Sequence, residues 1–185
     1  IPKSGNVIRY VYDEAGRLSA VVDPVRRTSE ITYWTESEAG AEGAYPGLVK
    51  KVEDWRGRVL DYEYDVATGT LTTVKLPETP NASGGRPAIK YGYATGGGGY
   101  SDRIELRSNL ASITAPHEAV TGGAPRVRFE YGDGGLERDR MVSQQWATGE
   151  TVSASYPSRT ETQTTDALGQ ERHYTTTEQP KDYWT

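Results

Sequence analysis

The chain has 185 residues, a formal net charge of −5 and a pI near 5.2, and its scattered basic residues exclude the concentrated positive charge of a nucleic-acid or anionic-membrane binding surface. No apolar run approaches the ~20 residues of a membrane-spanning helix, and residues 1–10 lack the apolar stretch of a signal peptide, so we expect no membrane insertion. The absence of cysteine excludes disulfides, thiol catalysis and cysteine-ligated zinc.

The first predicted elements are two alternating runs joined by the polar segment Asp13-Glu14-Ala15-Gly16-Arg17. An Asp side chain can accept a hydrogen bond from the backbone two residues later, and Gly adopts positive φ without steric cost, so the segment predicts a tight hairpin turn. The segment recurs as Asp54-Trp55-Arg56-Gly57-Arg58 and Asp166-Ala167-Leu168-Gly169-Gln170, while Asp23-Pro24-Val25-Arg26-Arg27 has Arg26 in the Gly position. We expect positive φ at the three glycines of these turns. We therefore interpret the following as structural turn residues: Asp13, Gly16, Arg17, Asp54, Gly57, Arg58, Asp166 and Gly169.

A second repeated pattern is an anchor residue followed by an apolar residue at the third position and by Pro or an aromatic residue at the sixth. The anchors are Leu18, Val49, Leu71 and Leu110. Their spacing predicts a unit of about 22 residues that is lengthened by insertions, as in repeat proteins.

The predicted strands alternate polar and apolar residues, most clearly at residues 60–64, 89–93 and 127–131. Thirteen tyrosines and four tryptophans against one phenylalanine suit half-buried sheet faces. No segment has a helical apolar stripe with caps, so we expect no helix longer than a turn. The pattern predicts an all-β protein of consecutive antiparallel hairpins.

Four segments rich in Gly, Pro, Ala, Glu or Thr interrupt the strands, near residues 35–47, 78–87, 94–102 and 117–125. Such composition is typical of surface loops, so we expect these insertions to be mobile loops that are cleaved first by proteases. They are too short to be linkers between domains, and we expect residues 1–185 to form a single region.

The run Tyr12-Asp13-x-x-Gly16-Arg17-Leu18-x-x-Val21-x-Asp23-Pro24 resembles the YD repeat of the Rhs and teneurin family. Eroded copies occur at residues 52–65, 71–77 and 165–174, so the resemblance covers about two thirds of the chain. Three departures are the Arg at position 26, an extra residue in the turn at 65–69, and residues 132–160, which match poorly.

The resemblance implies a curved or spiralling sheet of hairpin repeats that forms a hollow shell, of which this chain would be one segment. In bacterial toxin systems such a shell encloses a toxic polypeptide, and in teneurins it belongs to adhesion proteins at the cell surface. It therefore implies a secreted or cell-surface, bacterial location, and two kinds of partner: the remaining repeats or another chain, and an enclosed toxin polypeptide. Some members cleave themselves at a Pro-rich Asp-Pro-x-Gly core, which this chain lacks.

Candidate catalytic and metal-binding groups are few, and we predict no catalytic residue, no cofactor and no metal. Asp61 and Glu63 share a strand face, as Asp13 and Asp65 would if the repeats stack, but alternating charges are typical of the solvent-facing side of a strand. The histidines His117 and His173 are far apart in sequence. The glycine-rich segments at 96–99 and 132–135 lack the residues of a calcium or phosphate loop. Asn81 begins a match to the glycosylation acceptor pattern, but a three-residue match is frequent by chance.

The four tryptophans could stack on sugars, but cross-strand packing is the simpler interpretation. Trp34 is the exception, because alternation places it opposite Ile31 and Tyr33. Two functions remain: a structural shell segment that encloses or presents another polypeptide, and an adhesion or carbohydrate-binding β module. An enzyme is the third, less supported alternative.

Both ends of the sequence have strand patterns, at residues 7–12 and 172–177, without the polar caps that repeat arrays need where stacking stops. Such edges are templates for further strands. We therefore expect the sheet to be completed by other chain, from a larger shell or from a second copy.

Overall fold

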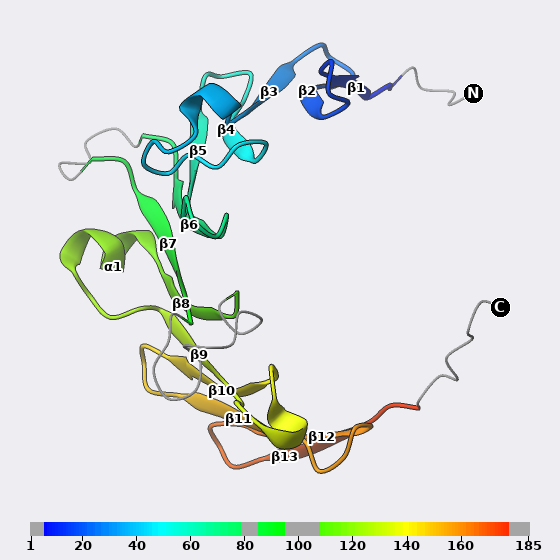
Figure 1. Cartoon of the computed structure of the whole chain (residues 1–185), viewed down its shortest axis with the longest axis vertical. Coiled ribbons are helices and arrows are strands. Elements are labelled where there is room, and N and C mark those ends of the chain that lie inside the picture. The colour runs from blue at the N-terminus through cyan, green and yellow to red at the C-terminus, as the bar shows by residue number, and fades with distance from the viewer. Residues whose placement is uncertain (1–5, 79–84, 95–107, 178–185) are drawn as a thin grey trace. The chain divides into compact units, whose positions relative to one another are not determined.

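The computed structural model describes residues 6–78, 85–94 and 108–177, and β-strands dominate this part of the chain (Figure 1). The strands are β1 (Arg9–Tyr12), β2 (Leu18–Val22), β3 (Thr28–Tyr33), β4 (Val49–Glu53), β5 (Val59–Tyr64), β6 (Leu71–Lys75), β7 (Ala88–Tyr93), β8 (Leu110–Thr114), β9 (Val127–Tyr131), β10 (Met141–Trp146), β11 (Thr151–Ser155), β12 (Glu161–Thr165) and β13 (Glu171–Thr175). The helical segments are η1 (Glu36–Glu38), α1 (Pro116–Thr121) and η3 (Gly135–Glu137). No helix in this part is long and apolar enough to cross a membrane.

The strands form one open sheet whose order, β1 to β13, is the order of the chain. Each pairing between consecutive strands that the structure describes is antiparallel, as in the β1–β2 and β12–β13 hairpins. The prediction of an all-β fold of consecutive antiparallel hairpins is therefore confirmed. Antiparallel neighbours joined by short turns are what period-2 segments separated by turn residues produce.

All four predicted anchors are the first residues of strands, namely β2, β4, β6 and β8. The repeat thus corresponds to one hairpin that begins with an even-numbered strand. Four register shifts occur where an odd-numbered strand pairs with the next strand, and in each the extra residue lies in the even-numbered strand. They lie next to Tyr12, Tyr33, Tyr64 and Tyr131, at the ends of β1, β3, β5 and β9. A bulge increases the local twist of a sheet, so we expect the strongest twist of these four strand pairs beside the tyrosines.

The contacts divide the chain into two compact units. Unit 1 comprises Ile1–Tyr91 and Ala115–Gly123, and unit 2 comprises Gly92–Thr114 and Ala124–Thr185.

The two faces of the unit 1 sheet differ in polarity. Directly paired residues share a face, and Ile31, Val52 and Leu60 form one apolar row across β3, β4 and β5. Val74 and its partners Tyr62 and Ile89 continue this face. The opposite face carries a charged row, which consists of Lys51, Asp61 and Lys75, followed by Ala88.

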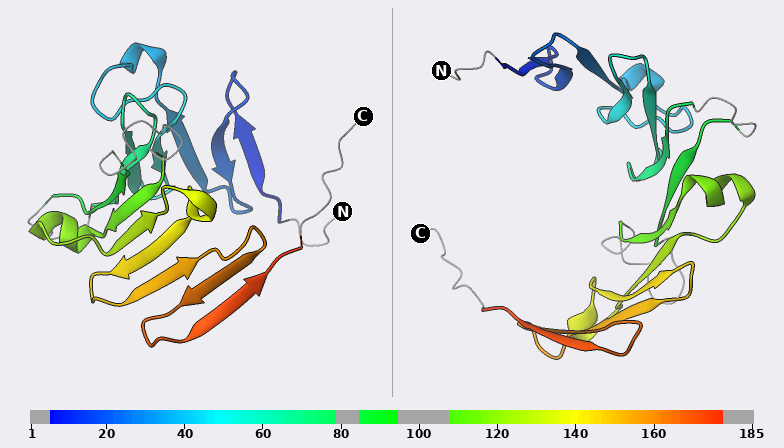
Figure 2. Two further views of the ribbon diagram at one scale, coloured as in Figure 1. Left: turned by 60° about the horizontal axis from the view of Figure 1, so that its bottom comes forward. Right: turned by 180° about the vertical axis from the view of Figure 1, so that it is seen from behind.

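The unit 2 strands β9 to β13 lie side by side in the left view of Figure 2, coloured from yellow-green to red. One face carries hydroxyl and amide side chains, for example the row Ser143, Ser153 and Thr165. The other face begins with apolar residues such as Phe129 and Val152 and becomes polar toward β12 and β13.

Few side chains of the described residues are buried. Three apolar residues are less than a tenth exposed, Ala44, Val74 and Ala154, and no polar or charged residue is buried. Most strand residues are instead half-buried. Each unit is therefore a sheet without a deep core, and its strands depend on pairing with neighbours more than on interior packing.

The prediction of no helix longer than a turn is wrong at residues 117–125. Helix α1 covers six residues there, with Pro116 at its start and Gly122 in a left-handed conformation (φ 69°) at its end. Pro at the first helical position and Gly just past the last are standard helix boundary signals. The prediction missed them because it searched for an apolar stripe over several turns, and α1 is too short to have one.

Candidate functional site

The turn that follows β2, β4 and β12, and also β1, has one backbone geometry. In the four predicted copies, the amide of the Asp donates to the carbonyl four residues later at 2.8–3.0 Å, and the amide of the third following residue donates back to the Asp carbonyl at 2.9–3.0 Å. The copies begin at Asp13, Asp23, Asp54 and Asp166. One local sequence pattern thus gives one turn in both units.

The Asp side chain closes each turn. Its Oδ1 accepts the amide of the residue four positions later at 2.8 or 2.9 Å in all four copies. Where that residue is arginine, its Nε also donates to Oδ2, at 2.8 Å from Arg17, 2.5 Å from Arg27 and 2.7 Å from Arg58. The sequence predicted the bond to the second following residue, and the structure adds this bidentate clasp to the fourth.

The clasp also affects the charge of the carboxylates. The backbone amide of Arg17 lowers the pKa of Asp13, and the guanidinium of Arg58 lowers the pKa of Asp54, although partial desolvation opposes both. At Asp23, desolvation is the largest single influence on the carboxylate, but the hydrogen bonds from Arg27 and Val25 together outweigh it, so the pKa of Asp23 is still lowered. These carboxylates are held as anions and are unsuited to donate a proton near neutral pH.

The positive φ expected at the turn glycines is confirmed, with 78° at Gly16, 73° at Gly57 and 77° at Gly169. Arg26, which stands in the same position of its turn, also has positive φ, 66°. A side chain in this region costs about 1–2 kcal/mol, so the turn geometry persists at Arg26 against the preference of the residue.

A further copy of the turn lies in residues 132–160, the segment that matches the YD-repeat pattern poorly. The amide of Trp146 donates to the carbonyl of Glu150, the amide of Gly149 donates to the carbonyl of Trp146, both at 2.9 Å, and Gly149 has φ 99°. Trp146 stands in the place of the Asp, so the Asp-based pattern could not find this copy.

Tyrosine hydroxyls tie the ends of hairpins together. Tyr33 donates to the carbonyl of Leu18 at 2.8 Å, and Tyr156 donates to that of Met141 at 2.8 Å, each across 15 residues. Tyr131 donates to the carbonyl of Leu110 at 3.1 Å across 21 residues, which include α1. In each case the acceptor is the first residue of an even-numbered strand. A Tyr fifteen residues after the anchor is the signal that would have revealed the copy starting at Met141.

Arginines that precede these anchors cover the tyrosine rings. The guanidinium of Arg17 lies 4.3 Å from the ring centre of Tyr33, and that of Arg140 lies 4.8 Å from the ring centre of Tyr156. Both separations are within the range of cation–π attraction. The same arrangement of ring, hydroxyl and anchor carbonyl recurs in both units. The tyrosine is therefore part of the hairpin framework rather than a free binding group.

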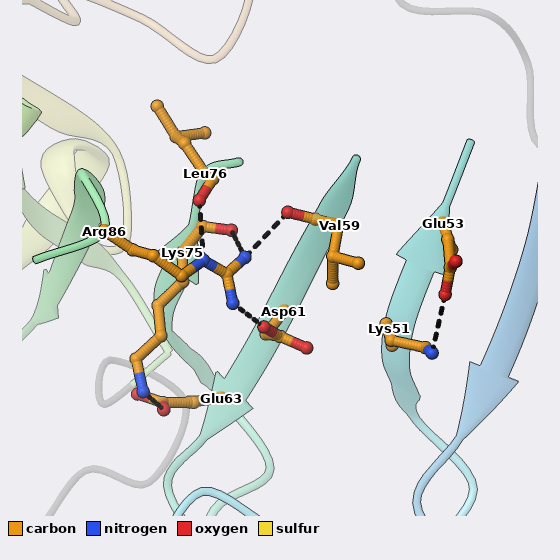
Figure 3. Close-up of polar contacts among 8 residues, drawn as sticks. All are labelled: Lys51, Glu53, Val59, Asp61, Glu63, Lys75, Leu76 and Arg86. Carbon is orange, nitrogen blue, oxygen red and sulfur yellow. Dashed lines mark hydrogen bonds and ion pairs between the residues drawn. The ribbon is translucent and has the colours of Figure 1, made fainter. Parts of the chain in front are cut away.

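The paired carboxylates Asp61 and Glu63 are engaged in ion pairs (Figure 3). Glu63 pairs with Lys75 across the β5–β6 hairpin, and Asp61 pairs with the guanidinium of Arg86. Arg86 donates in addition to the carbonyls of Leu76 at 2.9 Å, Val59 at 2.7 Å and Lys75 at 3.1 Å. Arg86 thus fastens the end of the 76–87 connection to two strands, and neither carboxylate is arranged as a glycosidase acid.

The insertion at residues 35–47 is packed against the sheet rather than free of it. Ala44 is 1% exposed, and the amide of Tyr64 donates to the carbonyl of Gly43 at 3.0 Å. A capping box formed by Thr35 and Glu38 starts η1, and Lys50 binds Glu38. These contacts favour an ordered segment, and the mobility and early proteolysis expected of this loop stay a prediction. Of the other insertions, residues 79–84 and 95–107 lie outside the described part, as do Asn81 and the glycine run at 96–99.

Trp34, the tryptophan singled out for ligand binding, is occupied within the fold. Its Nε1 donates to the carbonyl of Tyr62 at 3.2 Å, and Lys50 lies 4.4 Å from the centre of its ring. Trp55 is 46% exposed and contacts the guanidinium groups of Arg27 and Arg56, at 5.0 and 4.5 Å from the ring.

No group of three acidic or histidine side chains that could hold a metal occurs in the described residues. His117 lies in α1, and His173 lies in β13 with Nε2 3.9 Å from a carboxylate oxygen of Glu171. An open hollow of about 690 Å³ in unit 2 is bordered by the turns at 148–151 and 165–169. The Oδ1 of Asp166 in this hollow already accepts two backbone amides, so it serves the turn.

The sheet has exposed strands at both of its edges. Among the described residues, β1 pairs only with β2, and β13 pairs only with β12. All residues of both strands are exposed, including Tyr10 (56%) and Tyr174 (48%). Free backbone groups beside exposed apolar side chains are a template for strand addition.

No family model and no curated protein matches the sequence. Three solved structures are similar to it in fold. The crystal structure of TcdB2-TccC3-Cdc42 is 16% identical over 92% of this chain and 10% of that chain, with a TM-score of 0.46. The Photorhabdus luminescens Tc holotoxin pore is 15% identical over 90% of this chain and 9% of that chain (TM-score 0.44), and TcdB2-TccC3 is 14% identical over 91% and 10% (TM-score 0.43). The chain spans about a tenth of each structure, and similarity at this level assigns no function.

Proposed function

We propose that the chain is a structural segment of a β-shell that encloses or presents another polypeptide. The observation that carries this proposal is a sheet of consecutive hairpins with exposed strands at both edges and only three buried apolar side chains in the described residues. Such a sheet gains stability chiefly by adding neighbours, as the units of a repeat protein do.

The side chains whose geometry repeats from hairpin to hairpin stabilise the sheet of the proposed shell. The clasped Asp turns fix where each strand reverses, and the tyrosine hydroxyls fix the length of each hairpin. In this proposal the turn residues have a structural role, and no reaction is assigned to them. They are Asp13, Gly16, Arg17, Asp54, Gly57, Arg58, Asp166 and Gly169. Residues 1–185 act as one region of a larger shell, in a secreted or cell-surface, bacterial protein, as the resemblance to the YD repeat implies.

The proposal can be tested by asking what pairs with the edge strands. The sequence contains no cysteine, so a single Cys in place of Val11 in β1 reports on that edge without interference. Under mild oxidation of a mixture of the Val11→Cys and Tyr174→Cys variants, we expect disulfides that join one engineered thiol from each of two copies, with two electrons passed to the added oxidant. Mass spectrometry of the linked peptides then identifies which edge strands pair.

Val120→Cys is the matched control, because Val120 is 59% exposed but lies in α1. It should cross-link no more than random collision predicts. A chain that remains a monodisperse, cooperatively melting monomer at tens of micromolar, without cross-links from either edge strand, contradicts the proposal.

A cell-adhesion or carbohydrate-binding module is the second candidate, and the exposure of Trp55 is the observation that favours it. Exposed aromatic rings can stack on sugars, although two arginines already contact this ring. Binding on a glycan array that Trp55→Ala abolishes would support this candidate over the shell.

A further inference from the structure

The two ends of the strands in unit 1 carry opposite charge. Because each strand reverses direction, the connections after β2, β4 and β6 lie at one end of the strands, and those after β1, β3 and β5 lie at the other. Residue 9, at the start of β1, pairs with Val22 and therefore belongs to the first end. The net charge of the whole chain, −5, conceals this separation.

The first end, here named the arginine edge, carries six arginines, five in its described turns and one at the start of β1, against three carboxylates in the same turns. The arginines are Arg9, Arg26, Arg27, Arg56, Arg58 and Arg86, and the carboxylates are Asp23, Asp54 and Glu78. Arg9 and Arg26 border one hollow of about 460 Å³, and Arg58 and Arg86 border another of about 370 Å³.

The opposite end, here named the carboxylate edge, carries six carboxylates against one arginine in residues 13–17, 34–48 and 65–70. The carboxylates are Asp13, Glu14, Glu36, Glu38, Glu42 and Asp65, and the arginine is Arg17. Lys50, at the start of β4, binds Glu38.

The charges that face outward on each edge are those left over after the internal ion pairs. Arg17, Arg27 and Arg58 are each held by the Asp of their own turn. Other charged side chains are exposed and have no ion-pair partner in the described part of the chain. They are Arg9, Arg26 and Arg56 on the arginine edge, and Glu14, Glu36 and Glu42 on the carboxylate edge. Among the described residues, Glu78 on the arginine edge and Asp65 on the carboxylate edge are also exposed and have no ion-pair partner. The unpaired side chains therefore leave a net charge of +2 on the arginine edge and −4 on the carboxylate edge.

The arginine edge also has apolar side chains that a contact could cover. Trp55 is 46% exposed between the guanidinium groups of Arg27 and Arg56, and Val25 is 68% exposed on the adjacent turn. Trp and Arg are the residues most enriched at the energetic centres of protein interfaces. Ala44 and the capping box hold the carboxylate edge in place as a preformed surface.

We propose that these two edges bind each other head to tail, so that the carboxylate edge of one copy of this chain docks on the arginine edge of a second copy. A contact between two different surfaces of the same chain leaves one free edge at each end of a dimer, and further copies can add there. The contact uses turn residues of unit 1 together with Arg9 at the start of β1, and it forms no backbone pairing with β1 or β13.

Charge-reversal variants test the pairing. The first variant is Arg26→Glu with Arg56→Glu, and the second is Glu36→Lys with Glu42→Lys, which spares the Glu38–Lys50 pair. Sedimentation velocity of the wild-type chain should show association that weakens roughly tenfold when NaCl rises from about 50 to about 500 mM, because exposed charges are screened. Each variant alone should lose this salt-dependent association.

An equimolar mixture of the two variants should recover it, since each reversed edge then meets a complementary one. The control, Arg128→Glu with Arg159→Glu, makes the same change of charge as the first variant on exposed residues of unit 2 outside the edge strands, and it should associate like the wild type. Repeating the series with Val11→Lys and Tyr174→Lys removes strand addition, so failure of the shell proposal and failure of this one are distinguishable. Association that ignores salt and charge reversal, or variants that do not recover on mixing, would overturn the head-to-tail contact.

Discussion

At the scale of single residues, the Asp turn shows how a side chain and a backbone angle share the work of reversing a strand. The carboxylate of Asp54 accepts the amides of Arg56 and Arg58, and Gly57 supplies a φ of 73°. A Cβ placed on Gly16 or Gly169 would touch nothing within 4 Å, so only the backbone angle requires glycine there. The natural replacement at Arg26 shows that the turn survives without glycine.

Exchanging these residues should move stability in opposite directions. Gly16→Ala should lower the free energy of unfolding by about 1 kcal/mol, because Ala disfavours positive φ. Arg26→Gly should raise it by up to about 1 kcal/mol, since it relieves the same strain. Urea unfolding measures both changes. Arg56→Gly is the control, because its φ is not positive, and a gain in stability there would contradict the argument.

The Glu38–Lys50 pair makes the packing of residues 35–47 dependent on pH. The hydrogen bond from Lys50, together with the capping bonds from Thr35, lowers the pKa of Glu38 from 4.5 to about 2. The stabilisation is therefore complete above about pH 4.5 and is lost as the pH falls toward about 2.

Hydrogen exchange of the amides in residues 35–47 should accordingly accelerate over this interval, after correction for intrinsic rates. In Glu38→Gln the exchange should already be fast at pH 6 and should lose this dependence on pH. An unchanged pH profile in the variant would show that another group controls the insertion.

At the scale of elements, the repeated unit is a hairpin closed by a tyrosine. Tyr33 and Tyr156 reach the first carbonyl of the strand before their own, and an arginine covers each ring. The hydroxyl bond relates strand length to turn position, because it forms only when both strands have the correct number of residues. Insertions therefore accumulate in the connections, as α1 does between β8 and β9.

Removal of one hydroxyl should have a measurable effect. Tyr33→Phe should lower the free energy of unfolding by about 0.5–1.5 kcal/mol, because the carbonyl of Leu18 loses its donor while the ring contact with Arg17 remains. Tyr12→Phe is the matched control, since Tyr12 is 61% exposed and its hydroxyl has no hydrogen bond in the described residues. Equal effects in the two variants would show that the hydrogen bond from Tyr33 to Leu18 does not account for the loss.

At the scale of the whole molecule, the sheet is stabilised between neighbours. Each inner strand pairs with the strands before and after it in the chain, and the described residues contain no large core that joins distant strands. Stability in such an array is close to a sum of contacts between adjacent units, so it should vary along the chain.

Hydrogen exchange along the strands should reveal this gradient. We expect the amides of β1 and β13 to exchange fastest and those of β5 and β10 to be more strongly protected, because the outer strands pair on one side only in the described sheet. Protection of β1 and β13 should increase with protein concentration if the edges add strands. Uniform exchange through all the strands would instead indicate a single cooperative unit.

Local sequence was sufficient for the features that depend on a few adjacent residues. The alternation at 60–64, 89–93 and 127–131 predicted β5, β7 and β9, and the Asp-x-x-Gly pattern predicted the turns and the sign of φ at their glycines. Both rest on steric and hydrogen-bonding preferences that act within about five residues.

Only the tertiary structure decided what each of these features contacts. The ion pair of Arg86 and the burial of Ala44 each depend on residues brought together from separate strands or connections. The charge separation between the two edges of unit 1 likewise follows from the strand order, which places every second connection at the same end. Sequence patterns specify which residues can turn or pair, but the pairing of strands determines which of their side chains become neighbours, because that pairing acts across the sheet and not along the chain.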